Sequence, residues 1–287
     1  MLDRIVVPID FTEVSHIGIE TGKEISRKFG SKLYLLYVLK PIRNIPSDIV
    51  REEFDALMSL QEKLKEQTKE TLEGYASEIS SEGVDVEYSI LEGDEVESIL
   101  DFSKERRIEL IVMPSHKKTE VELRALGSVS LRVSSKASSS VLVIKGKPLT
   151  EISRILVNYD FLPTSIKAFE KALAIAKRFG SKIILLHVDN EEHHTHLRSI
   201  YQKVLEKKKT LLEDIRNQYK DVEMDTLLIK GNPKEEVLKI INQNSFDLVV
   251  IGRRNPTDKS RIFLGSLALE VLRNSPVSVL VSRGDDG

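Results

Sequence analysis

The strongest constraint on the fold is that the chain repeats itself. Residues 3–11 (DRIVVPIDF) recur as residues 153–161 (SRILVNYDF), and an FGSK sequence at residues 29–32 recurs at residues 179–182, both at an offset of 150 residues. Repetition at this distance in a chain of 287 residues predicts two copies of one domain, each long enough to bury its own hydrophobic core.

Later anchors recur at a shorter offset of 138 residues: Gly93 with Gly231, and Gly127-Ser128 with Gly265-Ser266. The first copy therefore carries 12 extra residues, which fall near residues 41–61. We predict domains at residues 1–146 and 151–284. The linker between them is short (KGKPLT, residues 145–150), which favours domains that pack together.

Each copy alternates short apolar runs with longer amphipathic stretches. The expected strands are residues 5–9, 32–39, 84–91, 110–113 and 140–145 in the first copy, and 154–159, 182–188, 224–230, 247–252 and 277–282 in the second. This alternation predicts an α/β fold of two tandem doubly wound domains, each a five-stranded parallel sheet with helices on both faces. In the long charged helix near residues 50–80, we expect Leu60 and Leu64 to pack onto the sheet.

Composition excludes several classes of protein. The formal net charge is −2, which argues against a dedicated nucleic-acid binder. The absence of cysteine excludes disulfides, thiolate catalysis and cysteine-ligated zinc. No apolar run approaches the ~18 residues that a membrane span needs, and the charged start (MLDRIVVPID) does not resemble a signal peptide. We therefore expect a cytoplasmic protein with no membrane contact.

A candidate phosphate loop follows the fourth strand of the second copy. Gly252-Arg253-Arg254-Asn255 is followed by nine residues and then by Gly265-Ser266, where a helix is expected to begin. Glycine allows close backbone approach, and the free N–H groups of a helix start attract anions. Arg253, Arg254, Lys259 and Arg261 would add positive charge. The alternative is a helix-opening glycine beside a solvated basic loop.

These motifs together resemble the universal stress protein family. The G-x2-N-x9-G-S spacing is similar to the ATP-binding loop of that family, G-x2-G-x9-G-[ST]. Other segments resemble its first strand, its Gly-x-Pro turn, its Gly-Ser helix start and its last strand: VVPID at residues 6–10, Gly231-Asn232-Pro233, LGSVS at residues 126–130, and SPVSVLV at residues 275–281. The resemblance covers nearly the whole chain, twice, and implies the strand order 3-2-1-4-5.

The resemblance also implies which residues would hold a nucleotide. In the second copy they are Asp160 and Val188 on the adenosine side and Gly252, Asn255, Gly265, Ser266 and Leu267 at the phosphates. Ile251 and Arg254 are also expected among the nucleotide-binding residues. In the first copy they are Asp10, Val38, Gly127, Ser128 and Val129. The implied ligand is ATP or AMP, which could be accompanied by Mg²⁺.

The two copies differ at the loop, and we favour the second as the binding site. In the first copy the loop starts with Pro114, which has no N–H to donate, and Lys117 replaces the second glycine. Alternatives stay open for the other positions. Asp10 and Asp160 could simply cap the following helix, and Gly231-Asn232-Pro233 could be a plain turn.

The resemblance implies a regulatory protein that binds an adenine nucleotide without fast turnover, and so not an enzyme. A slow ATPase and a non-binding dimerisation scaffold are the alternatives. Members of this family commonly pair through the last strand. The two copies could pair in this way within one chain, and two chains could form a homodimer. The protein partner is not indicated by the sequence.

Two histidine-containing segments suggest other chemistry. Glu191-Glu192-His193-His194-Thr195-His196 could supply metal ligands, although a solvated loop is the simpler interpretation. His16-Ile17-Gly18-Ile19 resembles the His-x-Gly-His of adenylyl-transferring relatives of this fold. The second histidine is absent, so we interpret His16 as a surface or core residue.

Overall fold

The computed structural model describes residues 2–42, 50–115, 128–190, 198–253 and 264–283. The elements of the first half are β1 (Arg4–Ile9), α1 (Glu13–Phe29), β2 (Lys32–Leu39), α2 (Arg51–Ser81), β3 (Val86–Glu92), α3 (Glu95–Glu105), β4 (Leu110–Pro114), α4 (Ser128–Lys136) and β5 (Ser140–Ile144). Those of the second half are β6 (Arg154–Asn158), α5 (Pro163–Phe179), β7 (Lys182–Asp189), α6 (Arg198–Gln218), β8 (Met224–Lys230), α7 (Pro233–Gln243), β9 (Leu248–Gly252), α8 (Ser266–Asn274) and β10 (Ser278–Ser282).

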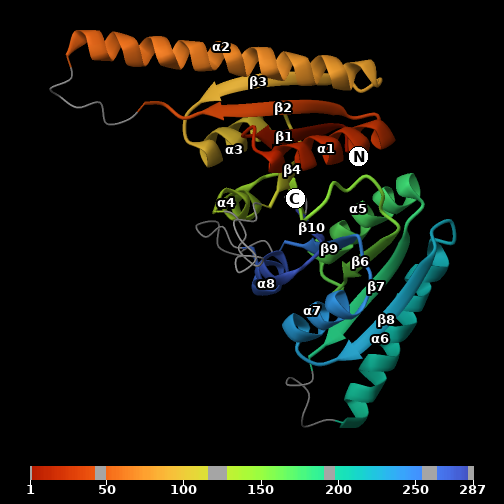
Figure 1. Cartoon of the computed structure of the whole chain (residues 1–287). Helices are drawn as coiled ribbons and strands as arrows, with labels where there is room; N and C mark the ends of the chain where they lie inside the picture. Colours follow the sequence, from red (N-terminus) through yellow and green to blue (C-terminus); the bar gives the residue numbers. More distant parts are fainter. Residues whose placement is uncertain (1, 43–49, 116–127, 191–197, 254–263, 284–287) are drawn as a thin grey trace.

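All ten strands belong to one sheet, in the order β3-β2-β1-β4-β5-β10-β9-β6-β7-β8. Within each half the strands are parallel and follow the predicted order 3-2-1-4-5, so the predicted fold class is confirmed. The halves join where β5 and β10 pair antiparallel, with Val141 opposite Val281. The last strands of the two copies thus pair within one chain, near the centre of Figure 1.

Hydrophobic cores lie on both faces of this sheet. Side chains alternate along each strand, so Val7 and Val157 belong to one core, whereas Val6 and Leu156 belong to the other. Burial on both faces explains why the strands are continuous apolar runs in the sequence.

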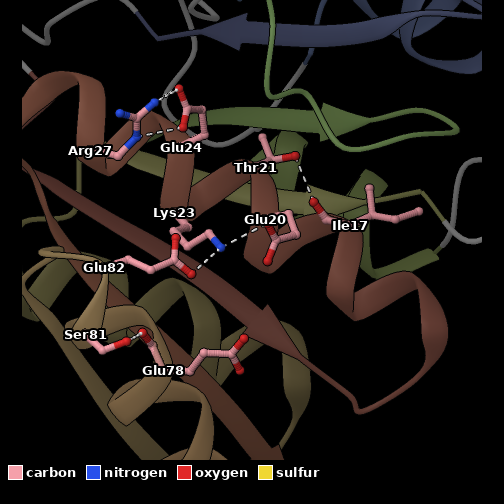
Figure 2. Close-up of polar contacts among 9 residues, drawn as sticks. All are labelled: Ile17, Glu20, Thr21, Lys23, Glu24, Arg27, Glu78, Ser81 and Glu82. Atoms are coloured by element: carbon pink, nitrogen blue, oxygen red, sulfur yellow. Dashed lines mark hydrogen bonds and ion pairs between the residues drawn. The ribbon is translucent and has the colours of Figure 1, made fainter.

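The middle of helix α1 makes polar contacts with the residue that follows α2 and with the linker between the halves (Figure 2 shows the first of these). Lys23 Nζ donates to Glu82 Oε1 at 2.8 Å, just after α2, and lies 3.1 Å from Glu20 Oε2 on its own helix. Two residues earlier, Thr21 Oγ1 donates to the carbonyl of Ile17 and accepts a hydrogen bond of 2.9 Å from the backbone N–H of Leu149. The linker is therefore bound to the first half before the second half begins.

The ends of α1 and α5 contact each other reciprocally across the join. Lys28 Nζ lies 5.4 Å from the ring centroid of Phe179, and Arg178 Cζ lies 5.7 Å from that of Phe29. The residues of the two contacts occupy equivalent positions of the two copies, with the cation and the ring exchanged between the halves. Such reciprocal contacts are typical of a two-fold interface. The two halves are therefore related by a pseudo-two-fold axis.

The expectation that Leu60 and Leu64 pack onto the sheet is wrong. Leu60 is 64% exposed and Leu64 is 45% exposed, and the buried side chains of α2 begin only at Thr68. Helix α2 has 31 residues, against 21 in its counterpart α6, and in Figure 1 it runs on past the arrowhead of β3. The extra residues of the first copy thus lengthen a helix beyond the sheet that would cover it.

Candidate functional site

A cavity of about 600 Å³ opens at the carboxyl ends of the second-half strands. It is bounded by the ends of β6, β7 and β9 and by the first turns of α5, α7 and α8. Seven of the predicted second-copy residues line it: Asp160, Val188, Ile251, Gly252, Gly265, Ser266 and Leu267. Arg254 and Asn255 lie outside the described residues. Since ligands of doubly wound sheets bind at this edge, the cavity is the candidate site.

Two helix starts face this cavity. Helix α8 begins at Ser266, directly after Gly265, whose φ of 84° lies in the region that favours glycine. Helix α7 begins after Asn232, whose side chain caps it by accepting from the N–H of Lys234 at 3.0 Å. Asn232 is thus a turn and cap residue that also lines the cavity. The free N–H groups at such helix starts give this wall a positive potential.

The two first-strand aspartates both help to form the start of the following helix. Asp160 Oδ1 accepts from the N–H of Leu162 at 3.0 Å. Asp10 Oδ1 accepts from the N–H of Thr12 at 3.1 Å, from its hydroxyl at 2.7 Å and from Ser15 Oγ at 2.5 Å. Neither aspartate is itself the N-cap, because the N-caps of α1 and α5 are Thr12 and Leu162, neither of which makes a side-chain capping bond. The two carboxylates instead bind the turn before each helix, and Asp160 also lies on the cavity wall.

Gly252 has a packing reason to be glycine. A Cβ there would lie 2.6 Å from the backbone carbonyl oxygen of Thr164 and 3.0 Å from the N of Ser165. The end of β9 therefore touches the first turn of α5 directly. In the first half the glycine is on the helix and not on the strand. Pro114 ends β4, and Gly18 of α1 lies against its ring, so a Cβ added at Gly18 would lie 3.2 Å from Pro114 Cδ.

The corresponding cavity of the first half is smaller, about 290 Å³. Asp10 and Val38 line it, as predicted, together with Pro8, Tyr37 and Leu64. Ser128 and Val129, which begin α4, are not among its lining residues, and Gly127 lies outside the described residues. Within the described residues, the first half brings together only the adenosine side of its predicted site.

Arg253 does not serve the candidate phosphate site, and that expectation is wrong. Its guanidinium donates across the join to the last carbonyls of α4: to Ala137 at 2.8 Å, Ser135 at 3.3 Å and Ser134 at 3.5 Å. Carbonyls at a helix end attract cations, and this carbonyl cluster is only visible once the halves are packed. The side chain is 9% exposed, and burial lowers the pKa of Arg253 to about 10, so it stays charged at neutral pH.

His187 is a buried residue of the cavity wall that the sequence reasoning missed. Its Nδ1 lies 2.7 Å from the carbonyl oxygen of Tyr159, so this nitrogen carries a proton. Its Nε2 is buried without a hydrogen-bond partner among the described residues, 3.9 Å from Asp189 Oδ2, which Lys208 Nζ already contacts at 2.6 Å. Burial is the main cause that lowers the pKa of His187, and nearby Lys208 acts in the same direction.

We expect His187 to make the protein less stable in mild acid. An unfolded histidine titrates near pH 6.5, and the folded site takes up its proton only at lower pH, so protonation favours unfolding. The free energy of unfolding should therefore be highest above about pH 6.5 and fall towards pH 5. Urea unfolding at several pH values should show a weaker pH dependence in His187→Gln. A slope unchanged from the wild type would contradict this account.

The other histidines give no second site within the described residues. His16 is exposed on α1, where Tyr75 of α2 lies 3.2 Å from its Nε2. The cluster at residues 191–196 lies outside the described residues. In the parts of the chain that the structure describes, no group of three or more His, Asp or Glu side chains could hold a metal ion, and no helix is long and apolar enough to cross a membrane.

Known proteins match both halves of the chain. The model of the universal stress protein family matches residues 1–145 and again residues 151–283. Two universal stress proteins of Methanocaldococcus jannaschii are 32% and 29% identical, over alignments that cover 52% and 51% of this chain and 84% and 97% of the relatives.

Full-length likeness is found among solved structures. A universal stress protein from Archaeoglobus fulgidus DSM 4304 matches with a TM-score of 0.71 at 22% identity, covering 100% of this chain and 98% of its own. A functionally unknown protein from Pseudomonas aeruginosa PAO1 has a TM-score of 0.74 at 16% identity, covering 99% of this chain and 94% of its own. At these identities the likeness shows the fold, including its tandem arrangement.

Proposed function

Since the chain belongs to the universal stress protein family, we propose that its second half binds an adenine nucleotide, ATP or AMP, without fast turnover. In this proposal the protein is a regulator and not an enzyme. It works in the cytoplasm, and binding changes its contacts with a protein partner or with a second copy of the chain.

The observation that carries the proposal is the cavity of about 600 Å³. Its volume lies in the range of about 300–1,000 Å³ that small-molecule sites occupy. Val188 and Ile251 give it apolar wall for a base, and Ser266 at the start of α8 gives it N–H groups for phosphate. The first-half cavity of about 290 Å³ falls at the lower limit, and its fourth strand ends in Pro114.

The lining residues favour binding over hydrolysis. Asp160 is the one carboxylate among the described residues of the cavity wall, and its Oδ1 already accepts the N–H of Leu162. The Nδ1 of His187 faces the carbonyl of Tyr159, and its Nε2 is buried. Neither group is well placed to activate a water, which supports slow turnover or none.

Mass spectrometry of small molecules released from purified, denatured protein tests the proposal. We expect about one adenine nucleotide per chain in the wild type, and its loss in Gly265→Val. Valine at this position would be forced into a positive φ, which is strained for a β-branched residue. Its side chain would also crowd the N–H groups at the start of α8 that are expected to bind phosphate. Gly83→Val is the matched control, because Gly83 has the same φ of 84° but lies in an open turn away from the cavity. It should keep its nucleotide.

The other outcomes are equally informative. About two nucleotides per chain would mean that the first half also binds, despite Pro114. No nucleotide, with no binding of added ATP or AMP, would leave a scaffold and overturn the proposal. Phosphate release from ATP over hours, lost in Gly265→Val, would instead identify a slow ATPase.

A further inference from the structure

The second half exposes a set of large apolar side chains on helices α5 and α6. Four of them are 37–41% exposed: Leu162 and Ile166 at the start of α5, and Val204 and Leu211 on α6. Val204 and Leu211 are seven residues apart, so they lie on the same side of α6. We call these four residues the α5–α6 patch. Exposed apolar residues that gather in one place commonly mark an interaction site.

The first half shows which way these side chains point. There, Tyr75 Oη of α2 lies 3.2 Å from His16 Nε2 of α1, which joins the two helices. At the offset of 150 residues Ile166 takes the place of His16, so it lies on the side of α5 that faces α6. Ile215, like Tyr75, follows a buried leucine of the same core by three residues, and Leu211 is one turn before it. The α5–α6 patch therefore lies where the two helices face each other.

Positive charge surrounds the α5–α6 patch. Helix α5 carries four basic residues and one acidic residue, and α6 carries six basic and three acidic residues. Lys203 and Lys207 are exposed on α6, on either side of Val204 along the helix. An apolar patch flanked by basic residues fits an amphipathic helix that is rich in acidic residues.

Helix α2 has this complementary character. It carries eight acidic and four basic residues, and its overhanging start exposes two apolar pairs, each one turn apart: Phe54 with Met58, and Leu60 with Leu64. It cannot reach the α5–α6 patch of its own chain, because α2 packs on β3 and α6 on β8, the opposite edges of the ten-stranded sheet (Figure 1). The two complementary surfaces can therefore meet only between two copies of the chain.

We propose that the overhanging start of α2 in one copy docks onto the α5–α6 patch of a second copy. Helices α2 and α6 cover the same face of the sheet, since Leu72 and Leu212 belong to one hydrophobic core. Two copies related by a two-fold axis can therefore make the contact twice, each giving its α2 to the patch of the other. The inference does not depend on nucleotide binding, since no residue of the patch is among the described residues that line the second-half cavity.

Sedimentation velocity of the chain at rising concentration tests the proposal. The wild type should shift from monomer to dimer, and about 0.5 M NaCl should weaken this association by screening the charges. Leu60→Lys sets a positive charge against the basic patch, and Leu211→Glu sets a negative charge against the acidic helix, so each should weaken it at least about 10-fold. Ser77→Lys is the control. It adds the same charge at an exposed position about 25 Å further along α2 and should associate like the wild type.

Mixing the two variants separates this pairing from any other. Both replaced side chains are exposed, so the circular dichroism spectra should not change. An equimolar mixture of Leu60→Lys and Leu211→Glu should associate again, because the first keeps an intact patch and the second an intact α2. In the other contact of the mixed pair, the introduced charges are of opposite sign.

Several results would overturn the proposal. They are a wild type that stays monomeric, an association that either variant leaves unchanged, and a mixture of the two variants that stays monomeric. Binding of a monomeric wild type to vesicles of phosphatidylserine and phosphatidylcholine, lost in Leu211→Glu, would assign the patch to a lipid surface instead of a second copy.

Discussion

Replacing Gly252 by alanine should destabilise the protein by about 3 kcal/mol, because the added methyl group would press on main chain and not on a flexible side chain. Its nearest neighbour would be the carbonyl oxygen of Thr164 at 2.6 Å, followed by the carbonyl carbon of Thr164 at 2.7 Å. Helix α5 would have to move away from the end of β9, and α5 also contacts β10 at the join. Urea unfolding followed by circular dichroism measures the loss.

Gly74→Ala is the matched control for this substitution. Gly74 lies in the middle of α2, where an added Cβ would have nothing within 4 Å. Alanine there should stabilise the protein by about 0.5–1 kcal/mol, through helix propensity alone. Equal effects of the two substitutions would show that the β9–α5 contact is looser than the structure indicates.

Replacing Arg253 by methionine should cost about 2 kcal/mol and weaken the coupling of the two halves. The variant leaves the carbonyls at the end of α4 without their donor, which is costly for buried groups. Part of this loss is offset, because burying the guanidinium is itself unfavourable, as its pKa of about 10 shows. Calorimetric unfolding measures both effects: the stability, and the change from one transition towards two.

Arg132→Met is the control for Arg253→Met, on the same helix that Arg253 caps. Arg132 is half-exposed, and its Nη2 lies 4.0 Å from Asp94 Oδ1. Exposed pairs of this kind contribute about 0–1 kcal/mol, so the change should be small and the single transition should remain. A comparable loss in both variants would mean that the contacts of Arg253 across the join do not stabilise the pair of halves.

The fold could be predicted because its determinants are local and repeated. The apolar runs that became β1 and β6, and the glycines Gly30 and Gly180 that end α1 and α5 at φ of 70° and 71°, are visible in the sequence and occur twice. Because each signal occurs twice, the order of the elements and the presence of two domains could both be predicted.

What the sequence could not give depends on contacts between distant segments. In the sequence, Arg253 looks like part of a basic phosphate loop. In the structure it donates to the carbonyl of Ala137 at the end of α4, which lies 116 residues earlier in the chain. Leu60 looks like a core residue until the length of α2 is compared with that of the sheet. His187 did leave a signal, because it is a polar residue near the end of an apolar strand where the first copy has Tyr37.

The pairing of β5 with β10 inside one chain frees the molecule from strict symmetry. In a dimer of identical subunits, every change at a two-fold interface is made twice, and it must suit both positions. Here Arg253 has Ser115 as its counterpart. Both backbone N–H groups donate to the neighbouring last strand, yet only the arginine reaches across to the other half. Since the halves also cannot separate on dilution, each can change in sequence without a matching change in the other, as the different sizes of their two cavities, about 290 and 600 Å³, illustrate.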